Sequence, residues 1–125
     1  MKILIVSQYF WPENFRINQI VDDFLQRGYK IDVLTGYPNY PDGKIFDEFK
    51  KNRKKFDQYL KAKIHRVPTI PRGKNKFSLV LNYSTFVFSS FLYAFVILTI
   101  FIVICKQSNI FFFTTIILLL ITYFV

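Results

Sequence analysis

Two short segments of the chain combine aromatic, carboxylate, amide and guanidinium side chains, which are groups that bind polar ligands. The first is YFWPENFR at residues 9–16, and the second is GYPNYPDG at residues 36–43. Carboxylates, amides and guanidinium groups hydrogen-bond to hydroxyl groups and phosphates, and tyrosine rings can face a sugar ring or a lipid phosphate. We therefore predict a substrate-binding surface made by Glu13, Asn14, Arg16, Tyr37 and Asn39.

A structural role is the competing interpretation for each of these residues. Pro38 and Pro41 stiffen the second segment, so its tyrosines can equally pack against the domain. Arg16 can be an exposed helix residue. Asn14 can cap the helix that follows, and Pro12 suits the first turn of that helix. The residue types alone leave both interpretations open.

Both segments are predicted to follow buried strands. KILIVSQ at residues 2–8 and KIDVLTG at residues 30–36 are short apolar runs of the kind found in parallel sheets. A helix that Gly28 ends is expected between them, because apolar residues recur there at helical spacing: Ile17, Ile20, Val21, Phe24 and Leu25. KIHRVPTI at residues 63–70 is predicted to be a further strand, with Pro68 marking an edge or an end.

The order strand, helix, strand predicts a right-handed unit with parallel strands. In sheets of this kind, ligands bind beyond the carboxyl ends of the strands. Because both ligand-binding segments follow such ends, we expect them at one edge of an α/β sheet.

Charge divides the chain in two. The formal net charge is +9, and residues 1–76 hold 16 of the 17 basic residues and all 8 acidic ones. Each basic residue near an anionic membrane contributes about 1 kcal/mol of attraction. We predict membrane-surface contact, with a solvated surface as the alternative, for the densest run: Lys50, Lys51, Arg53, Lys54 and Lys55. Nucleic acid is not expected as a partner, because the chain has no recognisable nucleic-acid-reading motif.

No cofactor and no metal ion is expected. The chain has one cysteine, Cys105, which lies inside an apolar run, and one histidine, His65. His65 has no carboxylate or cysteine beside it in the sequence, so a structural role is predicted for it.

The apolar half, residues 77–125, contains a single charge. Roughly 20 apolar residues cross the hydrocarbon core of a bilayer, so we predict one or two membrane helices, at about residues 84–105 and 110–125. The alternative is a soluble fold with a helix from Phe77 to about Cys105, a strand at residues 110–113 and another helix from residue 116. A soluble surface helix needs a polar face. Residues 87–105 and 116–125 have almost none, which favours insertion into the membrane. The basic half is then expected on the cytoplasmic side of the inner membrane.

Three segments together resemble one protein family: MKILIVSQYFWPENFRIN, VLTGYPNYPDGKIF and LNYSTFVFSS. Over about residues 1–90 the chain resembles the amino-terminal region of family-4 retaining glycosyltransferases, in the branch that builds bacterial capsule, O-antigen and exopolysaccharide. The resemblance implies the GT-B arrangement, in which two Rossmann-like domains face a cleft. The amino-terminal domain takes the acceptor, often a lipid-linked sugar at the membrane, and the carboxyl-terminal domain holds the nucleotide sugar.

The resemblance covers the acceptor side alone. In the family, the basic residues and the pair of glutamates that act on the nucleotide sugar lie in the carboxyl-terminal domain, whereas the only glutamates here are Glu13 and Glu48. Many relatives also have glycines in the first loop, where backbone N–H groups approach the diphosphate. This chain has Trp11, Pro12 and Glu13 there, which leaves Arg16 as the nearest cation.

The expected fold is thus a partial Rossmann-like parallel sheet at residues 1–76, followed by a membrane-embedded apolar segment at residues 77–125. From the resemblance we expect an amino-terminal fragment of a glycosyltransferase that uses a nucleotide sugar and a lipid-linked glycan acceptor in bacterial surface polysaccharide synthesis. Alone it is expected to be inactive and to need a separate donor-binding polypeptide. The alternative is a small non-enzymatic basic membrane protein that binds or scaffolds.

Overall fold

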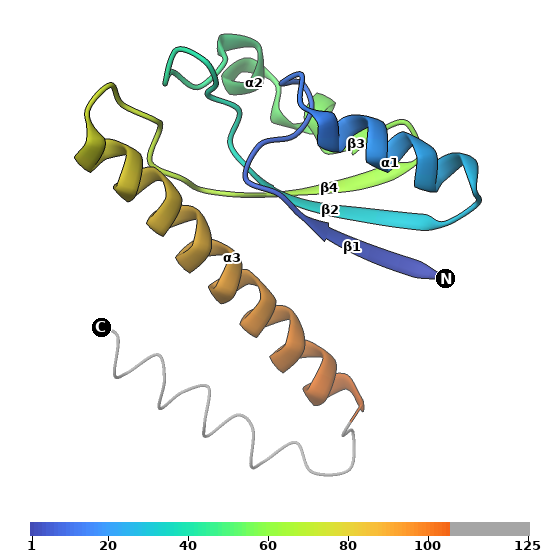
Figure 1. The fold of residues 1–125 in the computed structure, drawn as a ribbon. Helices are drawn as coiled ribbons and strands as arrows, with labels where there is room; N and C mark the ends of the chain where they lie inside the picture. Colours follow the sequence, from blue (N-terminus) through green and yellow to red (C-terminus); the bar gives the residue numbers. More distant parts are fainter. Residues whose placement is uncertain (106–125) are drawn as a thin grey trace. The chain divides into compact units, whose positions relative to one another are not determined.

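The computed structural model describes residues 1–105, which form an α/β fold with a four-stranded sheet and a long apolar helix (Figure 1). The strands are β1 (Lys2–Val6), β2 (Lys30–Gly36), β3 (Gln58–Tyr59) and β4 (Ala62–Val67). The helices are α1 (Arg16–Gln26), α2 (Asp47–Lys51), the 3-10 helix η1 (Arg53–Phe56) and α3 (Lys76–Cys105). The chain divides into two units, residues 1–91 (unit 1) and residues 92–125 (unit 2).

The three predicted strands are confirmed with small changes at their ends. β2 covers the predicted residues, β1 stops at Val6, and β4 stops at Val67, just before Pro68. The sheet order is β1-β2-β4-β3, with β1, β2 and β4 parallel. The short strand β3 was not predicted and pairs antiparallel with β4. The predicted strands are thus parallel as expected, and the additional strand β3 makes the sheet mixed.

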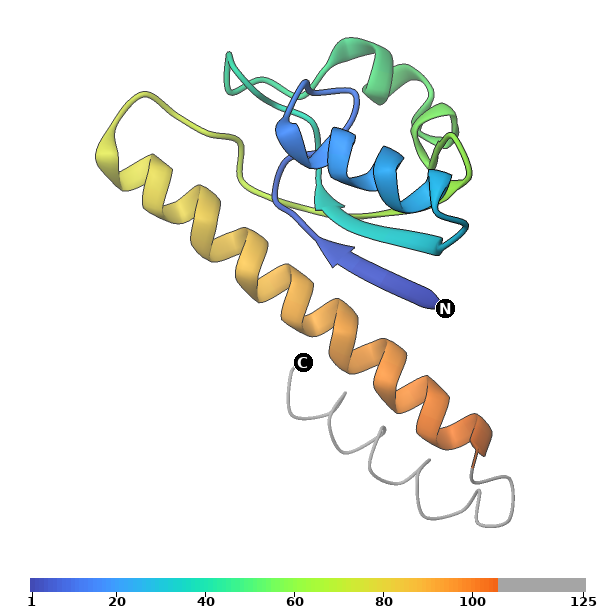
Figure 2. The same ribbon diagram turned by 45° about the vertical axis from the view of Figure 1, so that its right-hand side comes forward.

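Helix α1 covers one face of the sheet, as both ribbon views show (Figures 1 and 2). Its predicted apolar face is largely confirmed: Val21 is fully buried, and Ile20 is the exception at 41% exposure. Alternate side chains of the strands point to the same face, and those that pack there are Ile3, Ile5, Ile31, Val33, Ala62 and Ile64. Full burial of a valine or isoleucine side chain, such as Ile31, Val33 or Ile64, contributes roughly 1.5–3 kcal/mol, which stabilises the helix on the sheet.

Helix α1 begins later than the sequence predicts. Phe15 precedes its first residue, Arg16, and no side chain caps the helix. The predictions that Asn14 is the cap and that Pro12 lies in the first turn are therefore wrong. The physical reason is that the Glu13 side chain is buried at 4% exposure, which holds this segment in a turn outside the helix. Gly28 follows the helix with φ +82°, a conformation that glycine adopts readily.

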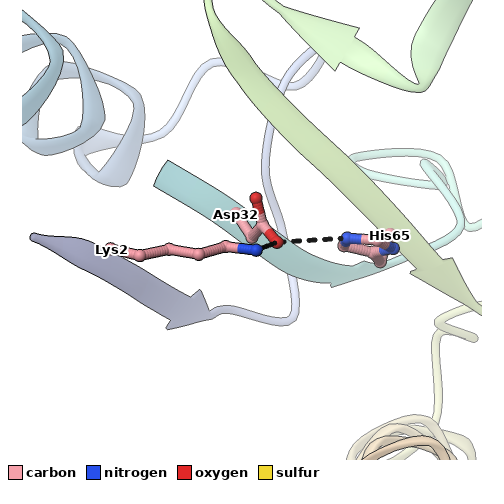
Figure 3. Close-up of polar contacts among 3 residues, drawn as sticks. All are labelled: Lys2, Asp32 and His65. Carbon is pink, nitrogen blue, oxygen red and sulfur yellow. Dashed lines mark ion pairs between the residues drawn. The ribbon is translucent and has the colours of Figure 1, made fainter. Parts of the chain in front are cut away.

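The opposite face of the sheet carries a titratable side chain from each of three neighbouring strands (Figure 3). The Nζ atom of Lys2 lies 2.8 Å from Oδ2 of Asp32, and Nε2 of His65 lies 3.6 Å from the same oxygen. Burial raises the pKa of Asp32, but the hydrogen bond and charge of Lys2 and the charge of His65 outweigh it, so the pKa is lowered overall. Strand pairing thus gives His65 a carboxylate neighbour that the sequence did not reveal.

The first turns of α3 belong to unit 1. Asn82 is fully buried, and its Oδ1 atom accepts hydrogen bonds from Gln8 Nε2 at 2.6 Å and from the Tyr9 hydroxyl at 2.9 Å. Its Nδ2 atom donates to the Ile70 carbonyl. These bonds tie the helix to the loops that follow β1 and β4. Helix α3 begins at Lys76, which is earlier than the membrane helix predicted at about residues 84–105 and one residue before the Phe77 start of the alternative.

Helix α3 is the one helix within residues 1–105 that is long and apolar enough to cross a membrane. Its candidate span is Lys76–Ile100, and 6% of the apolar window is buried, whereas the core helix of a soluble protein is mostly buried. The exposed large apolar residues of its second half are Leu92, Phe95, Val96, Ile97, Leu98 and Ile100. The predicted helix at residues 110–125, and the alternative strand and helix there, lie outside the described residues.

Candidate functional site at the carboxyl ends of the strands

Three loops follow the carboxyl ends of the parallel strands β1, β2 and β4. They comprise residues 7–15, 37–46 and 68–75, and together we call them the loop edge. Carboxyl ends of parallel strands meet at one edge of a sheet. Hydrogen bonds between the first and second loops confirm that the two predicted segments lie together.

Glu13 joins the first loop to the second. Its Oε1 atom accepts the backbone N–H groups of Asn39 and Tyr40, both at 2.7 Å. Burial raises the pKa of Glu13, although these two N–H groups and the charge of Arg66 act in the opposite direction. The carboxylate is therefore engaged inside the protein, and whether it also contacts a ligand stays a prediction.

Asn39 joins the second loop to the third and is 2% exposed. Its Nδ2 atom donates to the Tyr37 carbonyl at 2.8 Å, and its Oδ1 atom accepts the N–H of Arg72 at 3.3 Å. Its main-chain carbonyl accepts the N–H of Gly43 at 2.7 Å. The side chain that was predicted to bind a ligand thus holds the backbone of two loops in place.

Arg66 on β4 is a further organising residue, and the sequence analysis missed it. Its Nη1 atom donates to the Gly36 carbonyl at 3.0 Å, Nη2 to the Trp11 carbonyl, and Nε to the Phe56 carbonyl at 3.4 Å. Burial lowers the pKa of Arg66 to about 10, and the charges of Glu13 and Asp57 partly oppose this. The guanidinium therefore stays charged at neutral pH. Arg66 shares β4 with Lys63 and His65, so the sequence alone carried no signal that set it apart.

Two further predicted residues lie apart from each other. The ring of Tyr37 is half-buried and packs on Phe49, with centroids 5.3 Å apart, and the guanidinium of Arg53 lies 5.3 Å from the Tyr37 centroid. Asn14 is exposed beside the start of α1. Tyr37 therefore packs on the domain, as in the structural interpretation.

The predicted membrane-surface run is exposed along its length: Lys50, Lys51, Arg53, Lys54 and Lys55. Part of its charge is paired locally. Lys50 Nζ lies 2.9 Å from Oδ1 of Asp47, and Lys55 Nζ lies 4.0 Å from Oε2 of Glu48. The run is accessible to an anionic surface, with its charge partly offset by these two carboxylates.

Three aromatic rings form a cluster at the centre of the loop edge. The Tyr9 and Phe15 rings are stacked with centroids 5.2 Å apart, and Tyr40 lies 5.8 Å from Tyr9 and 5.0 Å from Phe15. We call Tyr9, Phe15 and Tyr40 the aromatic cluster. Burial and the neighbouring Tyr83 raise the pKa of Tyr9, so its hydroxyl is a neutral donor to Asn82.

An open hollow of about 350 Å³ lies on one side of the aromatic cluster. Its lining includes Ser7, Gln8, Tyr9, Phe15, Arg16 and Tyr83, and we call it the Arg16 hollow. Of the five predicted substrate-binding residues, Arg16 alone lines this hollow. The side chain of Arg16 is exposed and supplies the only cation of the lining. Tyr83, on the first part of α3, was not predicted, because a tyrosine within a long apolar run carries no distinguishing signal.

A second hollow, of about 680 Å³, includes the third member of the aromatic cluster in its lining. We call it the Arg72 hollow, and its lining includes Tyr40, Asp42, Lys44, Arg72, Gly73 and Lys74. The guanidinium of Arg72 lies 5.8 Å from the Tyr40 centroid. The sequence analysis did not identify this hollow, because Lys44 and Arg72 are far apart along the chain.

No group of three or more histidine, cysteine, aspartate or glutamate side chains that could hold a metal ion occurs in the part of the chain that the structure describes. Comparisons of the chain with known protein families, curated proteins and solved structures found no match. A functional assignment therefore depends on the loop edge, on helix α3 and on the resemblance noted in the sequence.

Proposed function

We propose that unit 1 is the acceptor-binding side of a retaining, GT-B glycosyltransferase that works at the cytoplasmic face of a bacterial inner membrane. The observation that carries the proposal is the Arg16 hollow, where an exposed guanidinium and two tyrosine rings meet at the carboxyl ends of parallel strands. Ligands of α/β sheets bind at this edge. The motif resemblance of the same loops to family-4 glycosyltransferases supports the proposal independently.

The chemistry of the Arg16 hollow suits a sugar that carries a phosphate. Tyr9 and Tyr83 offer ring faces for the apolar side of a sugar, and the neutral hydroxyl of Tyr9 is held by Asn82. Binding sites typically combine such apolar walls with a few placed polar groups. Arg16 supplies charge-assisted hydrogen bonds to phosphate or hydroxyl oxygens.

A membrane-bound acceptor fits helix α3. Its apolar surface keeps unit 1 at a bilayer, where lipid-linked glycans are found. The family residues that act on the nucleotide sugar have no counterpart among the residues of this chain. We therefore propose that a donor-binding domain or polypeptide completes the cleft, and we expect no sugar transfer by this chain alone.

The proposal predicts that Arg16→Ala weakens binding of a lipid-diphosphate-linked sugar by about tenfold or more, since a hydrogen bond to a charged group contributes roughly 1.5–3 kcal/mol. Binding is measured by microscale thermophoresis on the full chain in detergent micelles. Arg27→Ala is the matched control, because Arg27 is equally exposed but lies at the far end of α1.

Equal affinities for the wild type and Arg16→Ala would remove Arg16 from the site. A wild-type protein that stays in membranes but binds no lipid-linked sugar would favour the alternative function, a non-enzymatic basic membrane protein. The exposed basic run at residues 50–55 and the exposed apolar residues of α3 are the observations behind that alternative.

A further inference from the structure

We propose that the Arg72 hollow binds the phosphate of an anionic membrane lipid where α3 begins. The inference depends on membrane association and does not depend on sugar transfer. It assigns a specific lipid site, which is distinct from the diffuse attraction expected of the basic run at residues 50–55.

The lining of the hollow has a surplus of positive charge. Lys44, Arg72 and Lys74 contribute three cations against one carboxylate, Asp42. Within residues 1–105, none of these three cations takes part in an ion pair of 4.0 Å or less. Lys76, the first residue of α3, follows Lys74 by two residues in the chain and adds a further positive charge to this segment.

The hollow is held in shape by buried contacts. The N–H of Arg72 donates to the buried side chain of Asn39, and Glu13 holds the backbone of the same loop. Gly43 fits closely against the third loop, because a Cβ atom there would lie 1.8 Å from the Arg72 carbonyl oxygen. The loops that carry Lys44 and Lys74 are therefore preorganised for a ligand, which lowers the entropic cost of binding.

Helix α3 identifies a lipid as the source of the phosphate. Directly after the cations, Phe77 and Val80 are 71% and 60% exposed. A phosphate in the hollow is thereby followed along the chain by apolar side chains that acyl chains can contact. Inorganic phosphate has no apolar part that could contact these side chains, whereas basic clusters next to membrane helices bind anionic lipids.

A second basic hollow, of about 650 Å³, allows a test of whether charge alone makes the site. It lies at the amino ends of the strands, and its cations are Lys2, Lys30, Lys61 and Lys63. Lys2 is paired with Asp32 there. The strands, roughly 17 Å long at about 3.3 Å per residue, separate this hollow from the loop edge. It therefore provides a control hollow from which two lysines can likewise be removed.

The test compares three proteins in nanodiscs of phosphatidylcholine that contain some phosphatidylglycerol: the wild type, Lys44→Gln with Lys74→Gln, and Lys61→Gln with Lys63→Gln. The four lysines are exposed, so neither double variant disturbs a buried contact. Native mass spectrometry after release measures the ratio of phosphatidylglycerol to phosphatidylcholine on the protein. We expect the first double variant to lose about fivefold in this ratio per lysine, while the second keeps the wild-type ratio. Arginine at positions 44 and 74 is expected to restore it.

Equal losses in the two double variants would overturn the proposal in favour of diffuse charge attraction. A wild type that shows no phosphatidylglycerol enrichment would also overturn it. So would inorganic phosphate that binds the wild type in pure phosphatidylcholine nanodiscs and depends on Lys44 and Lys74, if the protein shows no preference between the two lipids. Sugar-acceptor binding is measured on the same variants, so failure of the lipid site and failure of the proposed function are distinguished.

Discussion

Glu13 is a residue with binding-site chemistry that the fold uses to join two loops. One carboxylate oxygen of Glu13 accepts the main-chain N–H groups of Asn39 and Tyr40, which lie 26 and 27 residues further along the chain. Burying a carboxylate is costly unless it is hydrogen-bonded, and these two bonds account for its position. The positively charged Arg66 likewise joins separate segments, because its guanidinium donates to three main-chain carbonyls.

We predict that Glu13→Ala lowers the free energy of unfolding by about 2–4 kcal/mol, because the buried N–H of Asn39 and the partly buried N–H of Tyr40 lose their acceptor. Glu13→Gln retains an acceptor oxygen and is expected to cost clearly less. The pKa of Glu13 is raised in the folded protein, so the ionised carboxylate opposes folding at neutral pH. The neutral amide of the glutamine variant removes this effect. Trp11, the only tryptophan, reports unfolding of unit 1 by fluorescence during urea titration of the full chain in detergent. Equal losses in the two variants would show that the charge matters rather than the acceptor.

Asp32 makes stability depend on pH in a predictable direction. Its pKa is lowered in the folded protein, so its stabilising effect is complete above the unfolded-state pKa, about 3.9, and is lost as the pH falls through the folded-state pKa. We expect Asp32→Asn to cost up to about 1 kcal/mol at neutral pH, and the difference from wild type to shrink in acid. Urea titrations at several pH values measure it, and a difference that grows in acid would contradict the assignment.

At the scale of the elements, the loops rather than the helices determine the candidate site. The strands end close together, and glycines permit the loops beyond them to approach closely. Gly43 has φ +66° and lies against the Arg72 carbonyl, whereas Gly28 has φ +82° and a Cβ atom added there would have no neighbour within 4 Å. These two glycines therefore separate the effect of backbone conformation from the effect of close packing.

We predict that Gly28→Ala costs about 1–2 kcal/mol, the penalty of a left-handed backbone. Gly43→Ala is expected to cost about 1–3 kcal/mol more, because the added methyl group forces the second and third loops apart. Urea titration with Trp11 fluorescence measures both. The expected order reverses only if the loops can move apart without loss of the Asn39 contacts, and amide hydrogen exchange of residues 37–46 would show that directly.

At the scale of the whole molecule, α3 is the one helix within residues 1–105 that is long and apolar enough to cross a membrane. Its 30 residues extend about 45 Å at 1.5 Å per residue, which is longer than the roughly 30 Å hydrocarbon core of a bilayer. Its first turns are held on unit 1 by Asn82. The membrane insertion proposed above would put these turns at the level of lipid headgroups and the later turns in the hydrocarbon.

We predict that Val96→Lys shifts the protein out of membranes, because a lysine near the centre of a membrane helix costs about 2.5–3.5 kcal/mol. Val96→Leu is the control and is expected to leave the protein in membranes. Both proteins are expressed at equal levels, and the fraction that stays with the membrane pellet after an alkaline carbonate wash is measured. Equal retention of the lysine variant would place this part of α3 outside the hydrocarbon core.

The sequence by itself determined the type and order of the main elements, because these follow from local patterns. The apolar run at residues 30–36 predicted β2 correctly, helical spacing predicted α1, and Pro68 marked the end of β4. The absence of charged residues over most of α3 predicted its apolar character. Strand β3 was missed, because two residues carry too little pattern to be recognised.

Only the tertiary structure decided which polar side chains organise the loop edge and which are exposed. Glu13 pairs with the second loop, Asn39 with Arg72, and Asn82 with Gln8 across 74 residues. Such pairings depend on how strand ends converge in space, which no local pattern encodes. The same convergence buried two predicted binding residues, Glu13 and Asn39, and left Arg16 lining a hollow.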